Sequence, residues 1–192
     1  KAVASMIESS AASKKLEEMA YHDFLTGLYN PSFVAKALGY AIFDAEKHHT
    51  LCAVLLLDLG AFKKINDQYG HHFGDLMLSY VARRLTDICD PKDVIARLIN
   101  DKFVVLMKSV LSTHDAGLYA RKIAEAFNLP MRIQGEDLRV AVSIGIACYP
   151  IAGITQDALM DHVQQALNKA KSSKTMKYAY YDPRVQNEHE RR

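Results

Sequence analysis

The stretch LCAVLLLDL, residues 51–59, decides the class of fold. It is a short continuous apolar run that ends abruptly near Asp58, a pattern typical of a strand buried on both faces of a sheet. Apolar residues at helical spacing precede it over residues 31–47, where Asn30 can cap the first turn, and helical spacing returns over 73–89. A buried strand between two helices predicts an α/β (α+β) domain with helices flanking the sheet.

The segments that follow add further strands and helices. Two β-rich runs are separated by the turn-forming residues 100–102, so they should pair as an antiparallel hairpin. Residues 135–137 are expected to form a turn between two more β-rich runs. Because helices alternate with strands around a hairpin, the sheet is predicted to be mixed. Strands are expected at 94–99, 103–108, 131–134, 138–149 and 178–181, and helices at 114–128 and 156–171.

The two ends of the chain have a different composition from its centre. Residues 1–20 are rich in helix formers with few apolar positions, which predicts a linker helix; pairing of this helix in a homodimer is the alternative to a solvated linker. Residues 182–192 are charged and lack an apolar period, so we expect a C-terminal linker. The domain proper then spans 21–181. Since the first residue is Lys1, neighbouring domains in the same chain are expected.

Composition narrows the classes of function. Apolar residues make up 49% and charged residues 24%, and the formal net charge is only +2 without a basic stripe, which argues against a nucleic-acid binder. No apolar run is long enough to cross a membrane. Cys52, Cys89 and Cys148 sit singly in apolar stretches, so neither a disulfide framework nor a structural metal is indicated. Reduced cysteines predict a cytoplasmic location for the domain.

The densest polar cluster is LDLGAFKKINDQYGHHFGD, residues 57–75. It combines a carboxylate at a strand end, which suits a divalent cation, with a lysine for phosphate charge and with amide and carboxylate groups that can pair with the edge of a guanine. The alternative is a purely structural role, in which turns and helix caps alone account for Asn66, Asp67, Gly70 and Gly74. The pair His71-His72 is not expected to bind metal, because adjacent side chains face apart.

Four motifs in register resemble the GGDEF (diguanylate cyclase) family: HDFLTGLYN (22–30), the cluster just described, RLINDKF (97–103) and SIGIACYP (143–150). The resemblance runs from about Tyr21 to Tyr181. It implies an adenylyl-cyclase-like fold with a mixed five-stranded central sheet. It also implies descent from enzymes that join two GTP molecules into cyclic di-GMP across a dimer, with Mg²⁺ or Mn²⁺.

The resemblance also assigns expected roles to individual residues. The expected metal ligands are a strand-end carboxylate and the carbonyl after it, and the expected nucleotide contacts are two guanine-reading side chains and two phosphate-binding lysines. In this sequence these are Asp58 and Leu59 for the metal, Asn66 and Asp75 for guanine, and Lys63 and Lys171 for phosphate.

The signature loop departs from the family pattern. The positions of two glycines, an acidic residue, Glu and Phe are occupied by Ile99, Asn100, Asp101, Lys102 and Phe103. Ile99 is β-branched and is expected to resist the left-handed backbone of a glycine, which Asn100 tolerates. Lys102 reverses the charge of a metal-binding Glu, leaving Asp101 as a weak ligand, and phosphoryl transfer depends on positioned metal charge.

Other family positions have also changed. Gly60 replaces a second strand-end Asp, Gln164 and Asn168 replace an acidic residue and a Tyr, and Thr175 replaces an Arg. The product-inhibition site of the family, Arg-x-x-Asp, is here residues 90–93 and has lost its Arg. Feedback binding of cyclic di-GMP at that site is therefore not expected.

These observations predict a degenerate, catalytically inactive GGDEF module that binds GTP, with Mg²⁺ or Mn²⁺ as its cofactor, and regulates a neighbouring domain. The tail EHERR (188–192) resembles the link that joins such domains to an EAL cyclic di-GMP phosphodiesterase. One alternative is a weakly active cyclase that uses Asp58 and Asp101. The other is a dimerisation or protein-contact scaffold that binds no nucleotide.

Overall fold

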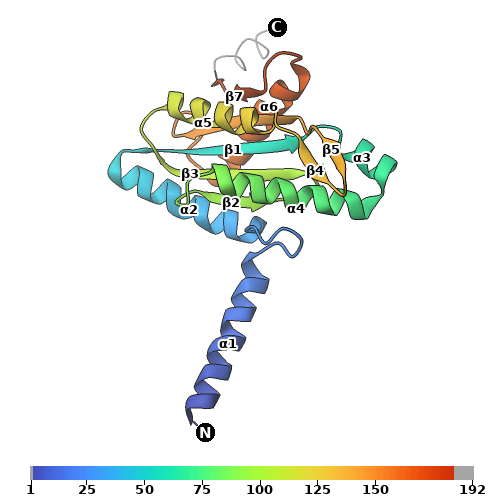
Figure 1. Ribbon diagram of the computed structural model, residues 1–192. Helices are drawn as coiled ribbons and strands as arrows, with labels where there is room; N and C mark the ends of the chain where they lie inside the picture. The colour runs from blue at the N-terminus through green and yellow to red at the C-terminus, as the bar shows by residue number, and fades with distance from the viewer. Residues whose placement is uncertain (1, 184–192) are drawn as a thin grey trace.

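The computed structural model describes residues 2–183, so all but the first two residues of the expected C-terminal linker lie outside the described range. A helix extends away from the domain as the N-terminal arm in Figure 1, and the remaining elements surround one sheet. In chain order the elements are α1 (Ala2–Tyr21), α2 (Pro31–His48), β1 (Leu51–Leu59), α3 (Phe62–Tyr69), α4 (His71–Ile88), β2 (Val94–Arg97), β3 (Lys102–Val110), α5 (Thr113–Ala126), β4 (Met131–Ile133), β5 (Glu136–Leu138), β6 (Val142–Tyr149), α6 (Gln156–Ser172) and β7 (Tyr178–Tyr180).

The main sheet has five strands in the order β2-β3-β1-β6-β7. Strand β1 lies at its centre and runs antiparallel to both β3 and β6, β2 pairs antiparallel with β3, and β7 pairs parallel with β6. The prediction of a mixed five-stranded sheet flanked by helices is therefore confirmed. Strands β4 and β5 form a separate two-stranded sheet.

Strand β1 is buried on both faces, as its apolar run predicts. Leu55 and Leu57 belong to the core that includes α4 and α5, whereas Val54 and Leu56 belong to the core that includes α2 and α6. Full burial of each leucine contributes about 1.5–3 kcal/mol. Since side chains alternate along a strand, the next residue after Leu57 faces α6. The carboxylate of Asp58 is thereby aimed at that helix.

Helix α2 begins where the sequence predicts. Asn30 Oδ1 accepts a hydrogen bond of 3.1 Å from the backbone N–H of Phe33, which satisfies one of the free donors of the first turn. Helix α2 ends before His49, which adopts a left-handed conformation. None of the described helices combines the length and the apolar character that a bilayer crossing demands.

Several local predictions are wrong. Residues 66 and 67, expected in a turn, belong to helix α3 (62–69). This helix was missed because its apolar positions, although they have helical spacing, span only eight residues and include one buried side chain, Ile65. Gly70, with φ of 89°, separates α3 from α4, so α4 starts at His71 rather than at residue 73. Residues 136 and 137 lie in β5 rather than in a turn.

The turn before β5 is shorter than expected. Gln134 and Gly135 both have positive φ, 50° and 85°. Two such residues close a tight hairpin by themselves. Glu136 is consequently free to pair with Ile133 in the β4–β5 ladder.

Candidate functional site

The carboxylate of Asp58 is held by a lysine of α6. Asp58 is 7% exposed, and its Oδ2 lies 3.0 Å from Nζ of Lys171. The lysine side chain is 47% exposed, so the pair is open to solvent on the lysine side. Lys171, which was expected to contact phosphate, thus supplies a positive charge directly to the expected metal ligand.

Lys102 lies on the strand next to Asp58. It is the first residue of β3, and its Cα is paired with that of Asp58 across the β1–β3 ladder, so both side chains point toward α6. Nζ of Lys102 donates a 2.8 Å hydrogen bond to Oε1 of Gln164, and Nε2 of Gln164 donates to Oδ1 of Asn168 at 3.0 Å. Three of the positions that depart from the family pattern are therefore bonded to one another.

The site contains a second carboxylate near Asp58. Burial raises the pKa of Asp101 above its usual range, and the negative charge of Asp58 raises it further. The backbone carbonyl of Asp101 accepts a 3.3 Å hydrogen bond from the N–H of Leu59, which ties the signature turn to the end of β1.

These residues do not fit a divalent ion held by the protein alone. The ammonium of Lys171 already neutralises Asp58, and the Glu expected beside it is Lys102. Within residues 2–183 no three acidic, histidine or cysteine side chains converge as a metal-binding group. A magnesium ion in such a site would depend on oxygens from the nucleotide phosphates.

The signature turn closes without backbone strain at Ile99. The N–H of Lys102 donates to the carbonyl of Ile99 at 3.0 Å, and Asn100 takes the left-handed position with φ of 53°. Ile99 does not have a positive φ, so the strain expected there is absent. Its side chain is 65% exposed and adds apolar bulk to the surface of the turn.

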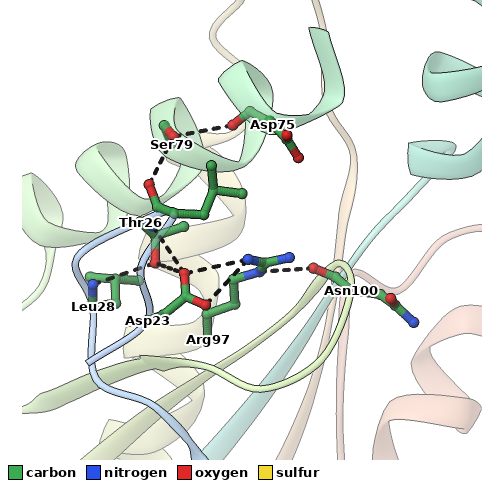
Figure 2. A network of polar contacts seen from close by, with 8 residues as sticks. Asp23, Thr26, Leu28, Asp75, Ser79, Arg97 and Asn100 are labelled. Atoms are coloured by element: carbon green, nitrogen blue, oxygen red, sulfur yellow. Dashed lines mark hydrogen bonds and ion pairs between the residues drawn. The ribbon is translucent and has the colours of Figure 1, made fainter. Parts of the chain in front are cut away.

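Two residues that the sequence analysis did not assign support this turn. Arg97 Nη1 lies 3.3 Å from both carboxylate oxygens of Asp23, and Arg97 Nε donates to the carbonyl of Asn100 at 3.0 Å (Figure 2). Asp23 also accepts hydrogen bonds from the N–H and hydroxyl of Thr26. Burial alone would raise the pKa of Asp23, but the contacts from Thr26 and Arg97 outweigh burial and lower it. The signal in the sequence was an Arg two residues before the altered signature.

The same loop contacts helix α4. Oγ of Ser79 lies 3.1 Å from the carbonyl of Asp75 and 3.4 Å from the carbonyl of Leu25, a residue of the loop that carries Asp23 (Figure 2). The loop that contains Asp23 and Leu25 therefore contacts both helix α4 and Arg97, the residue that supports the signature turn. The side chain of Asp75 itself is exposed.

Asn66 is the one described residue with a buried side-chain polar atom that lacks a hydrogen bond. Its Oδ1 has no partner within residues 2–183. A Cβ built on Gly74 would lie 1.8 Å from this oxygen, so only glycine at position 74 leaves space for the amide. A buried acceptor left unpaired costs about 1–3 kcal/mol. A ligand that donates to it would recover part of that cost.

The expected site residues thus fall into two groups. Asp58, Asp101, Lys102 and Lys171 lie together between β1, β3 and α6, whereas Asn66 and Asp75 lie on the neighbouring helices α3 and α4. Lys63 is exposed on the first turn of α3. Phe103, the last residue of the signature, is fully buried in the core with α4 and α5.

Residues 90–93, where the family resemblance places a product-inhibition site, are held by the hydroxyl of a tyrosine. The hydroxyl of Tyr119 donates to Oδ2 of Asp93 at 2.7 Å and accepts from the N–H of Asp90 at 2.8 Å. Burial raises the pKa of Tyr119 above its usual range, and its bond to Asp93 raises it further. The carboxylate of Asp93 is therefore already hydrogen-bonded within the domain.

Comparison with known proteins agrees with this geometry. Residues 20–177 match the family model described as diguanylate cyclase, GGDEF domain. The chain is 37% identical over 171 residues to MucR of Pseudomonas aeruginosa, a bifunctional diguanylate cyclase/cyclic di-GMP phosphodiesterase, covering 89% of this chain and 25% of MucR. It is 31% identical over 178 residues to PdeR of Escherichia coli, a cyclic di-GMP phosphodiesterase, covering 93% of this chain and 26% of PdeR.

A solved structure gives the same result for the fold. The isolated GGDEF domain of TpbB (also called YfiN) from Pseudomonas aeruginosa superposes with a TM-score of 0.82 at 34% identity, covering 87% of this chain and 99% of that one. The chain spans only about a quarter of the length of MucR and PdeR.

Proposed function

This chain belongs to the GGDEF domain family of cyclic di-GMP signalling, and on that premise we propose that it is a catalytically inactive member that binds GTP and regulates an adjacent domain of the same protein. The adjacent domain is an EAL-type cyclic di-GMP phosphodiesterase. GTP acts as a regulatory ligand rather than as a substrate.

The observation that supports GTP binding most directly is the unpartnered amide of Asn66. Its Oδ1 is buried without a partner within residues 2–183, and it occupies the space that a Cβ on residue 74 would take. The amino group of a guanine can donate to this oxygen, and the carboxylate of Asp75 can accept from the ring N–H. An adenine offers a different arrangement of donors and would leave these groups unpaired.

Loss of catalysis follows from the charges around Asp58. Lys171 pairs with that carboxylate, and Lys102 faces it from the next strand at the position of an expected metal-binding Glu, so two ammonium groups flank the expected metal ligand. Ammonium groups attract phosphate but cannot activate an attacking hydroxyl by coordination. The site therefore stabilises bound triphosphate without promoting its reaction.

The link to a phosphodiesterase rests on the relatives. MucR and PdeR are both much longer than this chain, and the names of both include cyclic di-GMP phosphodiesterase activity. In such a protein, an inactive GTP-binding module can make the activity of the hydrolytic domain depend on the GTP concentration. This requires that the GTP-bound and GTP-free forms of the module contact the hydrolytic domain differently.

Isothermal titration calorimetry of the chain with GTP and with ATP, each with and without Mg²⁺, tests this proposal. We expect GTP to bind, ATP to bind at least about tenfold more weakly, and Asp75→Ala to abolish the difference. Asp87→Ala, an exposed change on the same helix, is the matched control. Equal affinity for the two nucleotides, or binding of neither, would contradict the proposal and favour the scaffold alternative.

A further inference from the structure

The outer edge of the main sheet at β7 is open within the described residues. Strand β7 is the last in the strand order and pairs only with β6. Ile144 N–H donates to the carbonyl of Lys177, and Tyr181 N–H donates to the carbonyl of Ile146. Because backbone groups alternate in direction along a strand, those of Tyr178 and Tyr180 point away from the sheet. Such an edge is a template for another strand.

A groove runs along this open edge. The cavity measures about 630 Å³ and is lined by all three residues of β7. Helix α5 forms one wall through Arg121 and Asn128, and Lys169 of α6 together with Lys177 lines the other side. Since α5 and α6 cover opposite faces of the sheet, the groove follows the edge itself rather than either face.

The strand that borders the groove is held rigidly. The hydroxyl of Tyr180 donates a 2.7 Å hydrogen bond to the carbonyl of Thr113, and its ring packs where Gly117 of α5 leaves no Cβ. Ala179 is 6% exposed on the opposite face of the strand. An edge fixed in this way offers its backbone groups in a constant geometry, which lowers the entropic cost of pairing.

The charge around the groove favours an acidic occupant. The segment 169–177 contains four lysines and no acidic residue. Lys171 is committed to Asp58, and Arg121 pairs with Glu125 at 2.8 Å. Of the other charged residues that line the groove, Lys169 and Lys177 outnumber Asp182, so the excess charge of the groove is positive. Strand β7 of a second copy has the sequence Tyr-Ala-Tyr and offers these lysines no carboxylate. A partner strand that carries carboxylates can pair with them.

We propose that the β7 groove binds an acidic, extended segment of a partner protein, which adds a strand to the sheet while its carboxylates meet Lys169 and Lys177. Backbone pairing with Tyr178 and Tyr180 supplies affinity, and the lysines supply selectivity. This surface involves none of the residues assigned to GTP, so it is independent of the proposed function.

Residue-resolved hydrogen exchange on the full chain, without nucleotide, tests the proposal. In the free chain the amides of Tyr178 and Tyr180 should exchange much faster than that of Ala179. An acetylated peptide in which Glu alternates with Val should slow both, whereas the same peptide with Lys in place of Glu should not. Protection of both amides in the free chain would mean that the chain covers its own edge, and would overturn the proposal.

A charge reversal separates strand addition from nonspecific attraction. Lys169→Glu combined with Lys177→Glu should weaken the acidic peptide by about fivefold, the loss expected for two exposed ion pairs, and should favour the Lys peptide instead. Lys14→Glu with Lys15→Glu, on α1, changes the net charge equally and should have no effect. Three outcomes would each overturn the proposal. They are an equal loss of affinity for the acidic peptide in both double variants, no change in amide exchange with either peptide, and sedimentation of the chain as a dimer joined through β7.

Discussion

At the scale of single residues, the side chains that depart from the family pattern in this site form hydrogen bonds with one another. The ammonium of Lys102 needs a hydrogen-bond acceptor. Oε1 of Gln164 accepts a hydrogen bond from it at 2.8 Å, and Nε2 of Gln164 donates to Asn168. The departures at positions 102, 164 and 168 therefore form one hydrogen-bonded unit rather than three separate losses.

Lys102 should contribute to binding of GTP without metal. Lys102→Glu replaces an ammonium by a carboxylate beside the phosphates, so we expect metal-free GTP affinity to fall by about tenfold or more and to rise with Mg²⁺ concentration. Calorimetry with and without Mg²⁺ measures both effects. Lys47→Glu, an exposed change at the end of α2, is the control. If affinity and its Mg²⁺ dependence stay unchanged, the side chain of Lys102 does not reach the nucleotide.

Asp23 should stabilise the domain only while it is ionised. Its pKa is lowered in the folded chain from 3.8, so its contribution is fully present above pH 4 or so and is lost as pH falls through the folded value. Asp23→Asn should therefore lower the free energy of unfolding at pH 7 by about 1–2 kcal/mol, and the difference should shrink in acid. Urea unfolding at both pH values tests this. Asp87→Asn should show no comparable effect, and a pH-independent difference would contradict the assignment.

At the scale of elements, the position of α6 depends on one glycine. A Cβ built on Gly145 of β6 would lie 2.4 Å from both the backbone nitrogen of Leu167 and the backbone oxygen of Val163. Neither atom belongs to a flexible side chain, so the helix itself would have to move. This close approach is what brings Lys171 and Gln164 over the ends of β1 and β3.

Gly145→Ala should therefore destabilise the fold and also displace α6, which carries Gln164 and Lys171. We expect a loss of about 1–3 kcal/mol in the free energy of unfolding, the usual range for an overpacked core. Gly60→Ala is the matched control, because the nearest atom to its Cβ, the carbonyl of Ala141, is 3.3 Å away. Urea unfolding of both variants decides the matter, and equal stability of the two would show that α6 adjusts without cost.

The elements that could be predicted are those whose pattern is local. The continuous apolar run of β1 and the cap at Asn30 are visible in adjacent residues, and both are confirmed. Helix α3 spans only eight residues and buries only Ile65, so its apolar spacing is too short to be told from a loop. The contact between Lys102 and Gln164 joins residues 62 positions apart, so only the packing of α6 on the sheet reveals it. The nucleotide roles of Lys63, Asn66 and Asp75 stay predictions.

At the scale of the whole molecule, the fold places two different surfaces at opposite ends of the strand order. Arg97 of β2 supports the signature turn, while β7 forms the far edge with its own groove. In Figure 1 the N-terminal helix α1 meets the domain beside α2. Asn30 ties its end by donating to the carbonyl of Ala20 at 2.9 Å. A movement of α1 can therefore be transmitted to the loop that carries Asp23 through this contact, without rearrangement of the core.

The domain should produce no detectable cyclic di-GMP from GTP with Mg²⁺ or Mn²⁺. Two ammonium groups near Asp58 would attract phosphate but would not replace the charge of coordinated metal in the transition state. Chromatography of the reaction mixture against a heat-inactivated sample measures this directly. Product above that background would establish the alternative of a weakly active cyclase that uses Asp58 and Asp101.

The hydrogen-bonded unit of Lys102, Gln164 and Asn168 bears on how the proposed loss of synthesis could be reversed. Changing Lys102→Glu alone would set a third carboxylate beside Asp58 and Asp101, with Gln164 no longer receiving an ammonium. Changing Gln164 alone to an acid would bind Lys102 more firmly in place. The first reversion therefore adds unfavourable charge, and the second fixes the lysine in the site. Recovery of synthesis from the proposed inactive state would require several coordinated changes at once.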